Sequence, residues 1–235
     1  MLNTIQKTVC ALAVLSATAL PVMAESIDVR VIGTISPTAC TPTLSGGGTV
    51  DYGNINPNIL SLDAFTVLTE KQLDFSITCD APAKLAIKAT NGRPGTVAGA
   101  TELAATGVAL SPVNLFGKTG VGVVGLGLDG DKKIGGYGIR IAGSTISIDG
   151  AKAAPLQSDD NHTTWTVTTD DLGSIYGRNS VRWNSWAVPG AKEPTAFTTL
   201  SGKLGVQAYI NKASKLDLSK PVALDGLSTI ELIYL

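Results

Sequence analysis

Apolar and polar residues alternate along several short segments of this chain, and a period of two is typical of a half-buried β-strand. The clearest alternation runs through residues 25–35, 71–82, 203–214 and 228–235. Residues 83–91 form a further apolar run, separated from 71–82 by a single turn signal at Pro82. We therefore expect these two runs to be adjacent antiparallel strands.

The middle of the chain, residues 92–155, is rich in Gly, Ala and Val and predicts several short strands with turns between them. Further short strands are expected within 163–171 and 180–190. No stretch of twelve residues carries a capped helical stripe, and only residues 64–73 have room for a turn of helix. Short strands separated by frequent turn signals predict an all-β protein built as a β-sandwich.

The first 24 residues have the layout of a secretory signal peptide. Lys7 is the only charge, an apolar run covers residues 9–20, and Val22 and Ala24 stand where a signal peptidase reads small or medium side chains. A membrane anchor is the alternative, but the apolar run is too short to cross about 30 Å of hydrocarbon as a helix. We predict export, with cleavage after Ala24.

Removing Lys7 from the 18 basic residues leaves 17 against 19 acidic ones, a net charge of −2 on the 211 residues of the mature chain. This balance attracts neither nucleic acid nor an anionic membrane surface, so neither is an expected partner. Cys10 leaves with the signal peptide, and the remaining pair, Cys40 and Cys79, predicts one disulfide in an oxidising compartment. Since the chain has a single histidine, no metal site is predicted.

Several motifs that suggest chemistry have simpler explanations. Residues 120–125 match G-x-G-x-x-G, but no helix follows to hold a pyrophosphate, so a flexible loop or a hairpin is expected. Asp129 and Asp131 are interpreted as turn formers. The acidic pairs 159–160 and 170–171 are interpreted as solvated loop charges rather than the paired carboxylates of a glycosidase.

No enzymatic site emerges from the sequence. A Ser-His-Asp triad would have to use His162, and no serine stands in a G-x-S-x-G elbow. Trp183 and Trp186 are a possible sugar-binding platform, although packing in the core is the favoured interpretation. We predict a protein that is not an enzyme and uses no cofactor.

The chain ends on "STIELIYL", an apolar strand with no polar tail after it. An open apolar strand edge recruits other chains. Together with the signal peptide, "VRVIGTISPTAC" and "FSITCDAP", this ending resembles the chaperone–usher fimbrial (pilin) subunits of Gram-negative bacteria. "GTISPTACTPTLSGGGTVDYGNI" is more narrowly similar to a poorly characterised fimbrial-like secreted family. The likeness covers residues 29–89 and 203–235.

The resemblance implies an immunoglobulin-like sandwich that lacks its last strand. A periplasmic chaperone would fill the resulting groove first, and the N-terminal extension of a neighbouring subunit would replace it at an outer-membrane usher. The protein would pass through the periplasm to a surface fimbria. Residues 25–36 would be the extension, and 37–235 a single pilin-like domain with an enlarged Gly-rich middle.

The resemblance also assigns residues. Cys40 and Cys79 match the family's disulfide pair. The donor-strand positions are Ile27, Val29, Val31 and Gly33, and the groove edge presented to the chaperone comprises Ile230, Leu232, Tyr234 and the carboxylate of Leu235.

The extension departs from the family pattern because only eight mature residues precede Gly33. A short donor fills fewer pockets, and each buried Val or Ile contributes roughly 1.5–3 kcal/mol. The alternative function is a secreted carbohydrate-binding adhesin with a pilin fold that does not polymerise, whose partners would be host or surface glycans.

Overall fold

A computed structural model describes residues 30–32, 38–169 and 171–235 of the chain. The chain divides into two compact units, Met1–Ser36 and Pro37–Leu235. The predicted signal peptide and the donor-strand positions Ile27, Val29 and Gly33 lie outside the described residues. The fold described below is that of the second unit.

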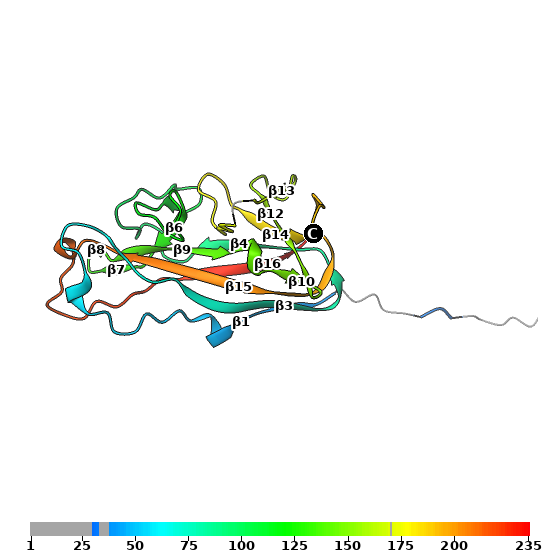
Figure 1. Ribbon diagram of the computed structural model, residues 1–235, viewed down its shortest axis with the longest axis horizontal. Helices are drawn as coiled ribbons and strands as arrows, with labels where there is room; N and C mark the ends of the chain where they lie inside the picture. Colours follow the sequence, from blue (N-terminus) through cyan, green and yellow to red (C-terminus); the bar gives the residue numbers. More distant parts are fainter. Residues whose placement is uncertain (1–29, 33–37, 170) are drawn as a thin grey trace, which may run out of the picture. The chain divides into compact units, whose positions relative to one another are not determined.

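The first antiparallel sheet has nine strands and is the longer layer of a sandwich (Figure 1). Its main path follows the order β1-β3-β15-β9-β6-β5, and β2 and β10 add to β15 while β11 pairs with β10. The bounds are β1 Cys40–Leu44, β2 Thr66–Val67, β3 Lys71–Ala83, β5 Ala109–Leu110, β6 Gly122–Gly125, β9 Gly135–Ile141, β10 Ser147–Ile148, β11 Ala151–Lys152 and β15 Phe197–Ile210.

The second sheet has five strands in the order β13-β12-β14-β4-β16. A separate two-stranded hairpin, β7-β8, carries Asp129 and Asp131 at its turn. The helical turns of the described residues are all 3-10 and short. The bounds are β4 Leu85–Asn91, β7 Leu128–Asp129, β8 Lys132–Lys133, β12 Ala154–Ser158, β13 Thr166–Val167, β14 Trp183–Ala187, β16 Ser228–Tyr234, and the 3-10 turns Ser45–Gly48, Pro57–Ile59, Gly143–Thr145 and Ala213–Lys215.

The two sheets enclose one main apolar core, which confirms the predicted all-β sandwich. Side chains of both sheets meet there, including Phe75 and Ile77 of β3, Leu85 and Ile87 of β4, and Trp186 of β14, each no more than 2 % exposed. Burial of such side chains stabilises a fold by roughly 1.5–3 kcal/mol each. The alternation seen in residues 71–82 therefore reflects one face turned to this core.

The predicted pairing of the runs 71–82 and 83–91 is wrong. β3 pairs with β1 and β15 in the first sheet, whereas β4 pairs with β14 and β16 in the second. The turn at Lys84 is thus a corner between sheets. Both strands turn an apolar face toward the same core from opposite sides, and alternation alone does not distinguish this corner from a hairpin.

Three further expectations need correction. Residues 64–73 contain β2 and the first residues of β3 and form no helix. The strand expected at 203–214 begins earlier, at Phe197, and ends at Ile210. Within 163–171 the only described strand is the two-residue β13.

The glycine motif at 120–125 mostly forms buried strand β6, which pairs with β5 and β9, so the hairpin interpretation is confirmed and the flexible loop is not. A Cβ on Gly125 would overlap Thr96 Oγ1, so close packing requires glycine there.

The predicted disulfide is confirmed. Cys40 of the edge strand β1 and Cys79 of β3 are directly opposite in the antiparallel register and are bonded to each other. The bond fixes one edge of the first sheet beside the core.

Candidate functional site

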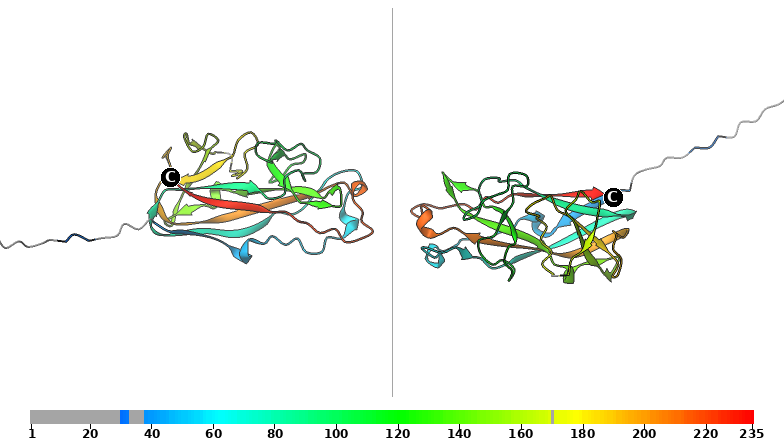
Figure 2. Two further views of the ribbon diagram at one scale, coloured as in Figure 1. Left: turned by 180° about the vertical axis from the view of Figure 1, so that it is seen from behind. Right: turned by 90° about the horizontal axis from the view of Figure 1, so that it is seen from above.

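The last strand, β16, lies at the edge of its sheet. It pairs with β4 along its whole length, from Ser228 opposite Asn91 to Tyr234 opposite Leu85. Its other edge pairs with no strand among the described residues. Figure 2 shows β16 in red along the sandwich, next to β4. β1 is the corresponding edge of the first sheet, so both layers are open on the same side.

An apolar groove runs between these two edges. It consists of two adjoining cavities of about 410 and 620 Å³, which share Thr49, Val50, Tyr52 and Leu224 in their walls. No side chain with a formal charge at neutral pH lines the first cavity. Its apolar lining comes from both sheets and from the flanking segments: Leu44, Leu73, Leu126, Ile139, Leu204, Val206, Leu224 and Ile230.

The groove's flanks are extended chain rather than paired strand. Residues 49–56 lie on one side and 221–227 on the other, and neither segment belongs to a strand. Of β16, only Ser228 and Ile230 line the first cavity, so the groove lies beside the start of the strand and continues past it along these segments. Its second cavity continues past these segments to Leu60, Ile210 and Leu216.

Tyr52 stands where the two cavities meet. Its hydroxyl donates to the carbonyl of Val206 at 3.1 Å and accepts from the amide of Ala208 at 3.2 Å, where the pairing of β3 with β15 ends at Val206. Burial is the main reason that the pKa of Tyr52 rises to about 12. The groove thus holds a neutral phenol at its centre.

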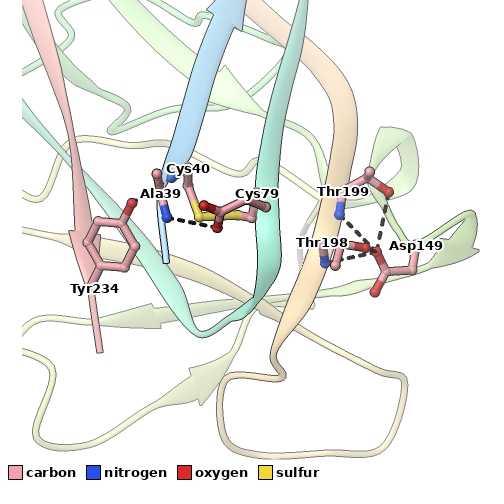
Figure 3. Close-up of a disulfide and its surroundings, with 8 residues drawn as sticks. Ala39, Cys40, Cys79, Asp149, Thr198, Thr199 and Tyr234 are labelled. Carbon is pink, nitrogen blue, oxygen red and sulfur yellow. Dashed lines mark hydrogen bonds between the residues drawn. A yellow bond between two sulfur atoms is a disulfide. The ribbon is translucent and has the colours of Figure 1, made fainter. Parts of the chain in front are cut away.

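The disulfide lies beyond the groove, near the end of β16, where β1 and β16 are joined by a hydrogen bond. The amide of Cys40 donates to the Tyr234 hydroxyl at 2.7 Å, and the amide of Ala39 donates to Asp80 Oδ1 at 2.9 Å (Figure 3). The Leu235 amide donates to the Lys84 carbonyl at 3.0 Å. This end is therefore bridged, and the rest of the edge of β16 is open.

On the far side of the same end, Asp149 fastens the β10-β11 turn to the start of β15. Its Oδ1 accepts from the amides of Thr198 and Thr199 at 3.0 and 2.8 Å (Figure 3). The side-chain hydrogen bond from Thr198, followed by the backbone bond from Thr199, holds the pKa of Asp149 below its usual value. Asp149 has a structural role in the sandwich.

Of the predicted groove-edge residues, Ile230, Leu232 and Tyr234 lie on β16, and Leu235 follows the strand. Ile230 lines the first cavity, and both Ile230 and Leu232 pack against the core while half-buried. Tyr234 is 50 % exposed. Of the predicted donor positions only Val31 is described, and it is 95 % exposed. Their roles in binding stay predictions.

The two predicted ligand tryptophans separate. Trp186 is 1 % exposed and packs in the core beside Phe75 and Phe197. Trp183 is half-buried, with the His162 ring edge-on at 4.7 Å and the Lys88 ammonium 5.6 Å from its ring centre. Trp183 and Trp186 therefore do not form one platform.

The acidic residues singled out in the sequence act in turns and ion pairs where they are described. Asp160 accepts from Ser158 and Thr164 within its own turn, Asp159 pairs with Arg182, and Asp171 accepts from Ser144. Asp129 pairs with Lys220. Within the described ranges no three His, Cys, Asp or Glu side chains gather as a metal site, and no helix is long and apolar enough to cross a membrane.

Sequence reasoning missed the side of the groove formed by residues 49–56 and 221–227. These segments show no alternation because they belong to no strand, and only their position between two alternating segments hints at a shared surface. Tyr52 was not predicted either, because nothing in its turn-rich segment marks this tyrosine as part of a groove.

Comparison with known proteins identifies relatives. The family described as "Protein of unknown function (DUF1120)" matches residues 29–138. The chain is 29 % identical to "Uncharacterized protein YhcF" of Escherichia coli K12 over 89 % of this chain and 90 % of that protein. It is 28 % identical to "Protein GltF" of the same organism over 96 % of this chain and 94 % of that protein. No solved structure matches the chain. These similarities point to a poorly characterised bacterial family.

Proposed function

We propose that the protein is an exported structural or assembly subunit of a surface fimbria, and that its groove accepts a β-strand from another chain. One observation carries the proposal. The edge of β16 is open, and a mainly apolar groove begins beside Ser228 and Ile230 and continues past the strand along residues 49–56 and 221–227.

Strand addition accounts for this geometry in physical terms. An added strand hydrogen-bonds to the free N–H and C=O groups of β16, and its alternate side chains enter the groove. The uncharged lining of the first cavity favours Val, Ile or Leu at those positions. Covering the edge also removes the aggregation hazard that an exposed apolar strand presents.

The chain itself carries a segment of the required pattern. Ile27, Val29 and Val31 have the period-two spacing that directs side chains to one face of a strand. The exposed fractions of Val31 and Ile32, 95 and 90 %, show that both side chains are accessible. In the proposed assembly a periplasmic chaperone covers the groove first, and residues 25–36 of a neighbouring subunit replace it at the usher.

The Cys40–Cys79 disulfide supports an exported protein, because such bonds persist in oxidising compartments such as the periplasm. The route runs from the periplasm to the cell surface. Since the extension is short, we expect a minor or terminal subunit at least as much as a repeating one.

The proposal is tested by periplasmic expression of the full chain with and without a fimbrial chaperone, followed by size-exclusion chromatography. We expect a soluble one-to-one complex with the chaperone, and its displacement by a peptide of residues 25–36. A peptide with Val29→Asp and Val31→Asp is the control and should not displace it. A stable monomer that binds neither the chaperone nor the peptide would exclude the proposed assembly.

A further inference from the structure

A polar pocket lies apart from the groove, between the β5-β6 region and the segment that precedes β14. Its volume is about 210 Å³, below the roughly 300–1,000 Å³ of sites for drug-sized ligands. It shares no lining residue with either cavity of the groove. It has room for one small polar ring.

One wall of the pocket is a segment that is held rigidly from several sides. The Thr106 hydroxyl donates to the carbonyl of Arg178 at 2.7 Å, and Asn184 Nδ2 donates to the carbonyl of Ile175 at 3.3 Å. Arg182 donates to Asp159 through two bonds of 3.0 Å. A pre-formed polar site loses less entropy on binding than one that must be ordered.

Glycines allow two of the walls to pack closely. A Cβ on Gly177 would lie 2.6 Å from the carbonyl oxygen of Ser180, and one on Gly122 would lie 2.8 Å from that of Tyr176. Gly120 has φ +68° and open space where a Cβ would stand. Of these three glycines, only Gly120 therefore leaves room for a ligand beside its backbone.

The charges of the pocket select an anion. Asp159 is matched by Arg182, whereas the exposed Arg178 has no ion pair or side-chain hydrogen bond with any described residue. Asn179 and Ser180 add an amide and a hydroxyl. A planar guanidinium with free donors binds carboxylates in two-point fashion, while amides, hydroxyls and Asp suit a ring bearing several hydroxyl groups.

We propose that this pocket binds a single carboxylate-bearing sugar residue, such as a uronic acid in a surface glycan. Arg178 binds the carboxylate. The ring hydroxyls form hydrogen bonds with Asn179, Ser180 and Asp159. The inference does not rest on strand exchange, because the pocket and the groove are separate.

The test is a titration of the full mature chain, followed by NMR or calorimetry, with three probes. Methyl β-glucuronide carries the carboxylate, methyl β-glucoside is its neutral counterpart, and acetate is a plain anion. We expect saturable binding of the glucuronide and binding at least about tenfold weaker for the other two, a difference of ~1.4 kcal/mol.

Arg178→Ala should weaken glucuronide binding by at least about tenfold. Since this side chain is exposed and unpaired among the described residues, the melting temperature should stay the same. Lys192→Ala is the matched control: it removes an exposed positive charge that forms no ion pair with the described residues, and it should leave binding unchanged. Asn179→Ala should weaken the binding of both sugars and leave any binding of acetate unchanged.

Three results would overturn the inference: equal binding of glucuronide and glucoside, acetate binding as tight as that of the glucuronide, or no saturable binding of any probe. Unchanged glucuronide binding by Arg178→Ala would also contradict it.

Discussion

Ser228, the first residue of β16, links the groove to the interior through its hydroxyl. The Tyr176 hydroxyl donates to Ser228 Oγ at 2.5 Å, and the Tyr137 hydroxyl lies 2.6 Å from the same oxygen. Both phenols are largely buried. A buried polar group that loses its hydrogen-bond partner destabilises the fold, because its desolvation is no longer compensated.

Ser228→Ala removes the shared partner of two phenols. We therefore expect a loss of about 1–3 kcal/mol in the free energy of unfolding, measured by urea denaturation. Ser147→Ala is the matched control, because Ser147 forms an exposed hydrogen bond with Ser201 at 2.9 Å. It should change stability by less than about 0.5 kcal/mol. Equal effects of the two substitutions would show that the network contributes nothing.

The tyrosines also predict how stability depends on pH. Burial raises the pKa of Tyr52 to about 12 and raises the pKa values of Tyr176 and Tyr209 well above the usual 10. The unfolded chain therefore loses these protons at lower pH than the folded one. Stability from the neutral phenols is complete below about pH 10 and is lost as pH rises through the folded pKa values.

Urea midpoints measured across this range should fall steeply above about pH 10. Tyr52→Phe removes one of the ionising groups, so its stability should fall less steeply with pH than that of the unchanged protein. Equal slopes for both proteins would contradict a raised pKa at Tyr52.

Single residues were predicted from the sequence with uneven success. The cysteine pair was predictable because two cysteines in an exported chain have one possible bond. Trp183 and Trp186 were not distinguishable, since the environment of each depends on strand β14 lying between β12 and β4. Arg178 carried no sequence signal, because its pocket is formed by segments far apart in the chain.

At the scale of elements, the disulfide holds an edge strand that has only one neighbouring strand. β1 is five residues long and pairs only with β3 along the main path of its sheet. Closing the chain between residues 40 and 79 stabilises the fold by about 4 kcal/mol in the chain-entropy account.

Replacing both cysteines, Cys40→Ser with Cys79→Ser, should therefore reduce the free energy of unfolding by about 2–5 kcal/mol. Urea denaturation measures this directly. The unchanged protein under reducing conditions should behave like the double variant. A double variant as stable as the oxidised protein would show that β1 is held by its strand pairing alone.

A second prediction about elements concerns β16 and its contact with the peptide. Ile230 faces the groove, whereas the adjacent Thr229 is exposed on the other face of the strand. Ile230→Asp should abolish binding of the peptide 25–36, because it introduces a charge into the apolar lining. Thr229→Asp introduces the same charge outside the groove and should leave binding intact.

Peptide binding is followed by fluorescence polarisation, and circular dichroism verifies the fold of each variant. Ile230→Ala is the milder variant, which keeps the lining apolar and should weaken binding without abolishing it. Equal binding by the two aspartate variants would place the peptide away from this groove.

Elements were predictable where one face of a strand is buried. β3, β14, β15 and β16 all fall within or across the segments that alternate or carry paired tryptophans. Which strands pair was not predictable, as the corner at Lys84 shows, because pairing is decided by the shared core. The two-residue strands had too few positions to show any period.

For the molecule as a whole, we propose that a strand from another chain completes the sandwich. One sheet ends at β16 and the other at β1, with the groove between them. The sequence suggested the open edge through its final apolar strand. It did not reveal that the groove continues past β16, because the flanking segments that line it have no periodic pattern.

The most direct measurement is hydrogen–deuterium exchange of the β16 amides, with and without excess peptide 25–36. We expect the β16 amides that are not bonded to β4 to exchange more slowly when the peptide is added, and to show no change with the Val29→Asp, Val31→Asp peptide. A strand-accepting groove would be contradicted if the unchanged peptide did not slow the exchange of these amides. It would also be contradicted if these amides already exchanged slowly without the peptide.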